Sequence, residues 1–224
     1  MNTSDALTAA LGALPAGITV PDVADSARLV DPAEIRADQI AERLSELIPP
    51  LWTDATASHP DIAAWADRVA AGDTCSLLLV GLVGRGKSHQ AYGALRRIVE
   101  RSWPRSLSIV AGPAPDLLDD ARPSPGVDGR EVIRRYREAD VLMLDDVGAE
   151  KGSDWVGEQL YRILDYRYRY LRPTLVVSNL PPEAPREANI HTLAAHLGDR
   201  LFSRLCQMCQ TVVITGPDRR RAAR

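Results

Sequence analysis

Residues 81–88 read Gly-Leu-Val-Gly-Arg-Gly-Lys-Ser, which matches the phosphate-binding loop pattern G-x-x-x-x-G-K-[ST]. The apolar run Cys75–Val80 before this loop predicts a short buried strand. After it, from Lys87 to about Arg101, apolar residues recur at helical spacing and predict a helix. A strand, a glycine-rich loop and a helix in this order form the setting that the pattern requires. The stretch therefore predicts an α/β fold that holds an anion where the helix begins.

The chemistry of the loop follows from its residue types. Glycines allow the backbone N–H groups to approach an anion closely, and the helix that follows presents the positive end of its dipole. Lys87 would then reach the β- and γ-phosphates of a nucleotide, and the Ser88 hydroxyl would coordinate Mg²⁺. The predicted nucleotide-binding residues are Gly81, Val83, Gly84, Arg85, Gly86, Lys87, Ser88 and His89.

A second chemical signal is a pair of carboxylates at the end of an apolar run. Residues 141–144 predict a strand buried on both faces, and Asp145 and Asp146 follow it directly. In a parallel sheet the ligand site lies at the carboxyl ends of the strands. Asp145 is therefore expected to hold Mg²⁺ together with Ser88, and Asp146 to orient or deprotonate the attacking water.

Composition limits the classes of function. The chain has 224 residues, 45% of them hydrophobic, which suits one α/β domain with a short extension. Its net charge of −3 excludes a strong global attraction to nucleic acid, so any such contact needs a local basic patch. Three cysteines, the lack of a charged signal-peptide region and the lack of a membrane-length apolar run predict a cytoplasmic location with no membrane contact. The abundance of Ala and Arg is typical of a GC-rich bacterial or phage genome.

The rest of the pattern alternates helices with strands, which predicts a parallel sheet with helices on both faces. One helix is expected from Pro32 to Leu47, and residues 1–32 are expected to be loosely ordered. A helix over 154–171 is expected to bury a stripe of Tyr161, Leu164, Tyr168 and Leu171. Further elements are expected as strands at 107–110, 174–178 and 211–214 and as helices at 59–71, 128–138 and 188–207.

Three domains are predicted along the chain. They are a partly helical extension at 1–49 with a possible role in partner binding, a nucleotide-binding core at 50–216 and a basic tail at 217–224. Cys206 and Cys209 could be half of a zinc site or a redox pair, but they are expected to be buried packing residues of a helix, because a zinc site needs a second ligand pair and none lies nearby.

Three polar residues late in the chain extend the predicted site. Asn179 ends the predicted strand at 174–178, where its side chain can contact the γ-phosphate or the attacking water. Arg200 and Arg204 lie four positions apart on one predicted helix face. A permanently charged, planar guanidinium suits an arginine finger that acts on a neighbouring subunit. The spacing alone fits a solvated helix face with salt bridges equally well.

Five motifs follow one another in order. They are the loop at 81–88, Leu-Met-Leu-Asp-Asp-Val-Gly at 142–148, Leu-Tyr-Arg-Ile-Leu-Asp-Tyr-Arg-Tyr at 160–168, Val-Val-Ser-Asn-Leu at 176–180 and Leu-Gly-Asp-Arg-Leu-Phe-Ser-Arg-Leu at 197–205. Together they resemble the DnaC/IstB family of AAA+ ATPases over about residues 50–216. The resemblance implies a three-layer αβα P-loop NTPase core with ATP or ADP and Mg²⁺ as cofactors.

The resemblance also implies roles. Lys87 and Ser88 match the Walker A motif, Asp145 and Asp146 the Walker B motif, and Asn179 the sensor 1 residue. Arg204 matches the arginine finger, with Arg200 as the second choice, which implies self-association with the active site at a subunit interface. The implied function is a helicase loader that binds single-stranded DNA and acts on a replicative ring helicase. Residues 219–221 are a weak match to a sensor 2 arginine.

Other functions remain open at this point. Asp146 stands where most of the family has Glu, and the shorter side chain predicts slow hydrolysis or an ATP-bound adaptor with negligible turnover. A transposition helper of the same family would assemble on duplex DNA instead. A small-molecule P-loop kinase would leave Asn179, Arg200 and Arg204 without a common role. The arginines at 130–137 are the predicted DNA contact, although a solvated helix face explains them too.

Overall fold

The computed structural model describes residues 31–150, 153–185 and 189–219. The chain divides into two compact units between Asp38 and Gln39, within helix α2 (Pro32–Leu47). The expectation of loose order for residues 1–30 lies outside the described residues. Every predicted site residue belongs to the unit that begins at Gln39, and the side chains of Leu44 and Ile48 join the hydrophobic core of that unit.

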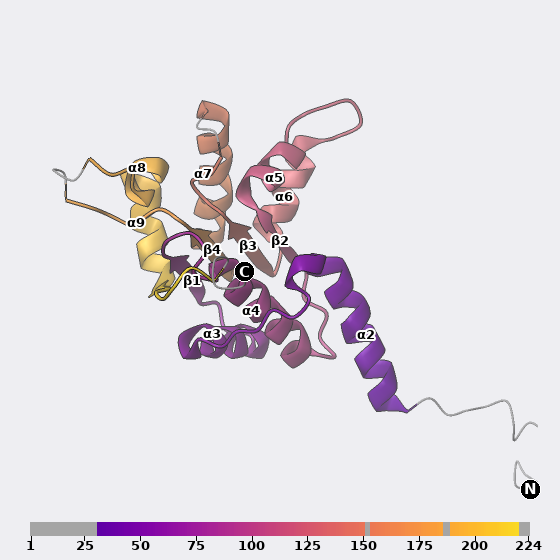
Figure 1. Ribbon diagram of the computed structural model, residues 1–224. Coiled ribbons are helices and arrows are strands. Elements are labelled where there is room, and N and C mark those ends of the chain that lie inside the picture. Colours follow the sequence, from indigo (N-terminus) through magenta and orange to yellow (C-terminus); the bar gives the residue numbers. More distant parts are fainter. Residues whose placement is uncertain (1–30, 151–152, 186–188, 220–224) are drawn as a thin grey trace, which may run out of the picture. The chain divides into compact units, whose positions relative to one another are not determined.

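A five-stranded parallel sheet forms the centre of this unit, as the sequence predicts (Figure 1). The strand order is β2-β3-β4-β1-β5, so β1, which leads into the glycine loop, lies between two strands from much later in the chain. In register, Val80 at the end of β1 pairs with Ser178 on one side and Val213 on the other. The strands are β1 (Ser76–Val80), β2 (Ile109–Pro113), β3 (Val141–Asp145), β4 (Thr174–Ser178) and β5 (Cys209–Val213).

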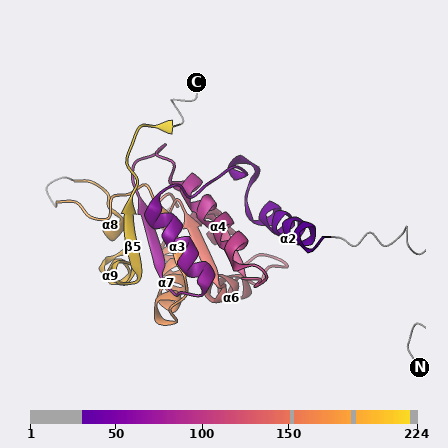
Figure 2. The ribbon, with the colours of Figure 1, turned by 90° about the horizontal axis from the view of Figure 1, so that it is seen from below.

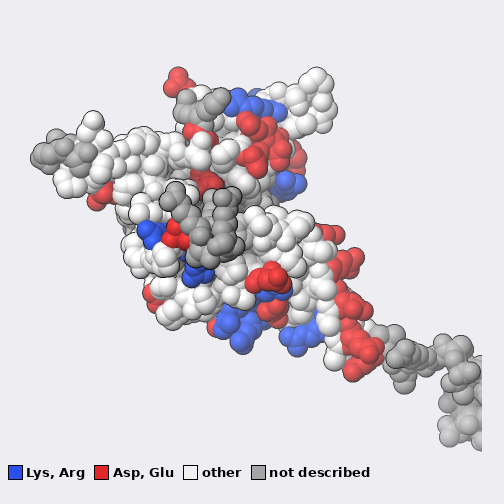
Figure 3. Space-filling view, viewed as in Figure 1, with Lys and Arg blue, Asp and Glu red and all other residues white. Residues whose placement is uncertain are grey.

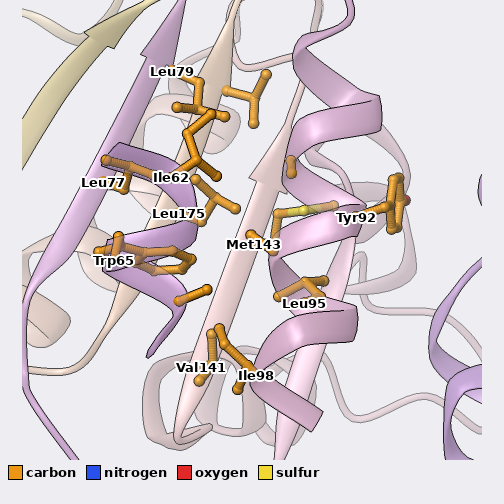
Figure 4. Close-up of a cluster of buried hydrophobic side chains, with 14 of the residues drawn as sticks. Ile62, Trp65, Leu77, Leu79, Tyr92, Leu95, Ile98, Val141, Met143 and Leu175 are labelled. Carbon is orange, nitrogen blue, oxygen red and sulfur yellow. The ribbon is translucent and has the colours of Figure 1, made fainter. Parts of the chain in front are cut away.

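Helices cover both faces of the sheet because alternate strand residues point to opposite sides. Leu77 and Leu79 of β1 pack in one cluster with α3 and α4, and Leu78 and Val80 pack in the other with α5, α6, α7 and α9 (Figures 1 and 2). Figure 4 shows the first cluster, where Trp65 and Ile62 of α3 face Leu77 and Leu175 of the sheet. The helices are α3 (Pro60–Ala71), α4 (Lys87–Ser102), α5 (Ala114–Asp120), α6 (Gly129–Glu138), α7 (Asp154–Arg169) and α9 (Asp199–Met208).

Local sequence sets the ends of several helices. The side chains of His59, Asp128 and Ser153 each accept a backbone N–H of the first turn, which satisfies a donor that has no partner inside the helix. Gly72 ends α3 in the left-handed conformation with φ of 104°, which a residue without a Cβ adopts at little cost. The predicted helices at 59–71 and 128–138 therefore form as expected.

The predicted apolar stripe on α7 is right for Leu164, which is buried, and for Tyr161, which packs partly buried against the same cluster, but wrong at its C-terminal end. Leu171 lies beyond the helix with its side chain 64% exposed, and the buried face consists of Val156, Gln159, Leu160, Ile163, Leu164 and Arg167. Arg167 is fully buried because its guanidinium donates to the backbone oxygens of Tyr136, Arg137, Ala139 and Pro173 and to the Thr174 hydroxyl. A stripe drawn from apolar residues alone does not include a buried arginine.

The single helix predicted over 188–207 is also wrong, since Gly198 with φ of 76° separates α8 (Leu193–Leu197) from α9. Residues 186–188 lie outside the described residues. Cys206 is exposed on α9, whereas Cys209 is the buried first residue of β5, so the two do not share a helix. The strands predicted at 107–110 and 211–214 are each displaced by about two residues from β2 and β5.

Candidate nucleotide-binding site

The loop between β1 and α4 lines a cavity of about 410 Å³. The N-terminus of α4 opens into this cavity, because Gly86, in the left-handed conformation with φ of 90°, is the N-cap and has no side chain to occupy the first turn. Predicted site residues from the loop, from the end of β3 and from the end of β4 line this cavity. Trp52, which precedes the loop, and Arg219, which follows β5, line it too. The lining residues are Trp52, Val83, Gly84, Gly86, Lys87, Ser88, His89, Asp146, Asn179 and Arg219.

Lys87 is buried at the first position of α4, and its ammonium group contacts oxygen atoms of the loop and of Asn179. Its ammonium group donates to the backbone oxygens of Gly81 and Leu82 at 2.8 and 3.0 Å and to the Oδ1 of Asn179 at 2.5 Å. A charge-assisted bond to a side chain on another strand fixes the lysine across the mouth of the loop. Its positive charge therefore lies between the predicted phosphate site and the ends of β3 and β4.

Ser88 and Asp145 form a second connection between α4 and β3. The Ser88 hydroxyl lies beside the carboxylate of Asp145, the residue that ends β3, and the Asp145 side chain is buried. Burial raises the pKa of the Asp145 carboxyl, the neighbouring charge of Asp146 raises it further, and the bond from Ser88 opposes both. A buried carboxylate beside a hydroxyl is the oxygen donor set that Mg²⁺ prefers, and a divalent cation would stabilise the charge that burial disfavours.

Asp146 and Asn179 meet at the ends of β3 and β4. The Nδ2 of Asn179 donates to the Oδ1 of Asp146 at 2.7 Å, so one amide joins Lys87 to Asp146. Asp146 has φ of 55°, a conformation that is uncommon for residues other than glycine and that asparagine and aspartate tolerate best. The following residue, Val147, is fixed to β4 through its N–H to Val177 and through the Ser178 hydroxyl, which donates to its carbonyl at 2.6 Å.

Aromatic groups line the other end of the cavity. Trp52 stacks on Tyr92 with ring centroids 5.8 Å apart, and it meets His89 edge to face at 6.3 Å. The Nε2 of His89 accepts the backbone N–H of Thr56 at 3.3 Å. Burial and then the charge of Arg219 lower the pKa of His89, so the ring is neutral at pH 7.

The residues after β5 cover the glycine loop. The N–H of Arg219 donates to the oxygen of Gly84 at 2.8 Å, and a Cβ at Gly84 would collide with the Asp218 carboxylate. Arg219 was only a weak match in the sequence. Trp52 was not among the residues predicted for the site. Its local sequence carries no signal for that role, since the short helical turn Pro50–Trp52 and the packing of the chain bring it to the cavity.

The predicted residues fall into three groups. Val83, Gly84, Gly86, Lys87, Ser88, His89, Asp146 and Asn179 line the cavity. Gly81, Arg85 and Asp145 are not among its lining residues, although Gly81 and Asp145 contact the lining residues Lys87 and Ser88. Arg200 and Arg204 are not brought to this cavity. Their guanidinium groups lie over the Tyr161 ring of α7 at 5.5 and 5.4 Å, and Arg204 also pairs with Asp165.

Two kinds of feature are absent from the part of the chain that the structure describes. No group of three or more His, Cys, Asp or Glu side chains that could hold a metal ion occurs in residues 31–150, 153–185 and 189–219. None of the described helices is long and apolar enough to cross a membrane.

Comparison with known proteins agrees with the geometry. No family model matches the chain. It is 25% identical over 144 residues to the phage-like element PBSX protein XkdC of Bacillus subtilis, covering 62% of this chain and 49% of that protein. It is 25% identical over 153 residues to the replicative helicase loader DnaI of the same organism, covering 64% of this chain and 47% of that protein. It is 24% identical over 134 residues to the replicative helicase loader DnaC of Escherichia coli K12, covering 60% of this chain and 51% of that protein. The chain thus spans about half the length of the curated relatives it matches.

Solved structures give the same result. A crystal structure of the DnaC helicase loader superposes with a TM-score of 0.60 and 27% identity over 75% of this chain and all of that one. A crystal structure of DnaI superposes with a TM-score of 0.54 and 26% sequence identity, covering 71% of this chain and 82% of that one. The replication initiator DnaA, bound to AMPPCP and single-stranded DNA, superposes with a TM-score of 0.57 over 75% of this chain and 51% of that one. At 18% identity this match shows the fold alone.

A parallel sheet in this order, with a glycine loop, two aspartates and an asparagine meeting at its carboxyl edge, defines an AAA+ P-loop domain. The sequence relatives include the DnaI and DnaC loaders, and the two superposed structures above 25% identity are a DnaC loader and a DnaI. In sequence and fold the chain is therefore similar to the DnaC and DnaI loaders, at modest identity.

Proposed function

We propose that this protein binds ATP with Mg²⁺, hydrolyses it, and uses the cycle to help load a replicative ring helicase onto single-stranded DNA. The observation that carries the proposal is the connected set of Lys87, Asn179 and Asp146, which joins the phosphate loop to the catalytic ends of β3 and β4. Similarity to the DnaC and DnaI loaders supports the choice among P-loop functions.

In this proposal the phosphates lie at the N-terminus of α4. Lys87 contacts the β- and γ-phosphates by exchanging one of its oxygen partners for a phosphate oxygen. Ser88 and Asp145 hold Mg²⁺, which neutralises charge on the phosphates when bound. The adenine base lies at the aromatic end of the cavity, beside Trp52 and His89.

Asp146 orients the attacking water, and Asn179 holds Asp146 in place. Because an aspartate reaches one methylene less far than a glutamate, turnover by this chain alone is slow. Arg204 completes the site of a neighbouring subunit, with Arg200 beside it. Within its own chain Arg204 contacts Tyr161 and Asp165.

Single-stranded DNA is assigned to a surface cavity of about 430 Å³ between α6 and α7. Arg130 and Arg137 line it together with Trp155, which combines cations for phosphates with an aromatic ring for a base. Arg162 lines it too, but Glu158 of the same cavity pairs with it at 2.6 Å. Acidic and basic side chains are interspersed across the face shown in Figure 3, so DNA binding would need a local group of arginines such as the one that lines this cavity. On α6, Arg134 forms ion pairs with Glu131 and Glu138 and is not a lining residue of this cavity.

The test is ATP hydrolysis by the purified protein with and without single-stranded DNA, beside Lys87→Ala and Arg130→Ala. We expect slow turnover that DNA stimulates, that Lys87→Ala abolishes and that loses its DNA stimulation in Arg130→Ala. DNA affinity should fall as salt rises. Tight ATP binding with no turnover under any condition, including added ring helicase, would instead identify an ATP-bound adaptor.

A further inference from the structure

Close to the carboxylates of the site lies a buried hydrogen-bonded pair that the proposed catalytic residues do not use. Glu150 and His196 approach to 2.6 Å between Oε1 and Nε2, and their side chains are 3% and 11% exposed. Two polar side chains buried this deeply impose one geometry on the segments that carry them, because breaking the pair leaves an unsatisfied group in the interior. The pair therefore defines how the loop after β3 and the helix α8 lie relative to each other.

On one side, Glu150 is tied to the site. Its Oε2 accepts the N–H of Gly148 at 2.9 Å, and the N–H of Ala149 donates to the oxygen of Asp146 at 3.0 Å. Gly148 lies so close to Leu180, the residue after Asn179, that a Cβ at position 148 would collide with it. A displacement of Asp146 or Asn179 therefore moves the loop that carries Glu150.

On the other side, His196 is tied to the arginines. It lies on α8, only two residues before Gly198, and α9 with Arg200 and Arg204 begins directly after that glycine. The start of α8 is fixed to the chain after Asn179, since the N–H groups of Leu193 and Ala194 donate to the oxygens of Pro181 and Pro182. The helices α8 and α9 follow one another on the β1 and β5 side of the sheet (Figures 1 and 2).

We propose that Glu150 and His196 are positioning residues that transmit the nucleotide state of one subunit to its own α8–α9 segment, and so to the Arg200 and Arg204 that it presents to a neighbour. The inference rests on the proposed function and adds to it the route by which the site of one subunit controls the next. Binding of a γ-phosphate between Lys87 and Asn179 shifts the end of β4 and the Asp146 loop, and the buried pair carries that shift to α8.

The test compares amide hydrogen exchange of the full chain with and without Mg²⁺ and ATPγS, a slowly hydrolysed ATP analogue. In the wild type we expect nucleotide to change exchange both in residues 146–150 and in residues 193–208. His196→Ala should keep ATPγS affinity within about threefold and keep the response of residues 146–150, but lose the response of residues 193–208. His196→Gln, which places an amide donor near the former Nε2, should restore it.

Hydrolysis gives an independent readout. His196→Ala should lower kcat by about tenfold or more while KM stays within about threefold, since the nucleotide is still held by Lys87 and Ser88. Asp67→Asn is the matched control, because it breaks an ion pair between α3 and α4 on the opposite face of the sheet and should leave every readout unchanged. Where His196→Ala lacks a cooperative melting transition, His196→Leu, similar in volume and without a polar atom, replaces it.

An α8–α9 response in His196→Ala equal to that of the wild type would overturn the inference. So would a wild-type protein that binds ATPγS and changes exchange only around the glycine loop, and in that case the proposed nucleotide function would stand. Failure of the wild type to bind ATPγS at all would remove the proposed function and the inference with it.

Discussion

The ammonium nitrogen of Lys87 lies 2.5 Å from the Oδ1 of Asn179, although the two residues are 92 positions apart in the sequence. The same asparagine donates to Asp146 from its other terminal atom. The side-chain amide of Asn179 thus contacts both the Lys87 cation and the Asp146 carboxylate. Its oxygen must accept from the lysine, and its NH2 group must donate to the carboxylate.

Asn179→Asp tests this double role. The new carboxylate still accepts from Lys87 but repels Asp146, where the amide donated. We expect kcat to fall by about 100-fold while ATP affinity changes by less than about tenfold, because the phosphate contacts of the glycine loop remain. Steady-state hydrolysis and a fluorescent-nucleotide titration measure the two quantities. A variant with wild-type kcat would show that Asn179 has no part in orienting Asp146.

The role of Arg204 in a neighbouring subunit is testable by mixing. Arg204→Ala and Lys87→Ala should each be inactive alone, yet an equal mixture should recover roughly a quarter of wild-type hydrolysis, since one subunit interface in four then joins an intact loop to an intact arginine. No recovery at any ratio would indicate that Arg204 acts only within its own chain, where it contacts Tyr161 and Asp165.

Arg167 is expected to matter for stability rather than for hydrolysis. Its guanidinium donates to four backbone oxygens at the end of α6 and the start of β4, and Met would leave them without donors in the interior. We expect Arg167→Met to lower the free energy of unfolding by about 3 kcal/mol. Urea denaturation measures it. Arg162→Met, on the exposed side of the same helix, is the control and should change stability by less than about 0.5 kcal/mol.

The Glu150–His196 pair predicts how stability depends on pH. Burial alone would raise the pKa of the Glu150 carboxyl, but hydrogen bonds from His196 and Gly148 hold it below its ordinary value of 4.5. The unfolded chain therefore binds the proton more readily, and the stabilisation is present above about pH 4.5 and lost as pH falls through the lower folded pKa. Glu150→Gln should flatten this acid limb of the stability curve. Identical slopes between about pH 5 and about pH 3 would contradict the prediction.

Sequence reasoning found the parts of the site that depend on local pattern. The loop at 81–88, the aspartates at the end of β3 and Asn179 after β4 all follow short apolar runs, and parallel strands bring such ends to one edge. It missed Trp52, Arg167 and the Glu150–His196 pair, because each depends on which distant segment packs beside it. Gly198 was a readable signal, since a glycine inside a helical pattern marks a possible break.

The position of β1 between β4 and β5 has a consequence for how the protein is made. Its neighbours in the sheet are strands that begin at Thr174 and Cys209, so a ribosome has added nearly a hundred residues before β1 gains its first partner. The β5 edge and Arg219, which lies over the glycine loop, arrive later still. A growing chain therefore carries the complete phosphate-loop sequence long before the strands and the C-terminal residues that complete the cavity around it have been made.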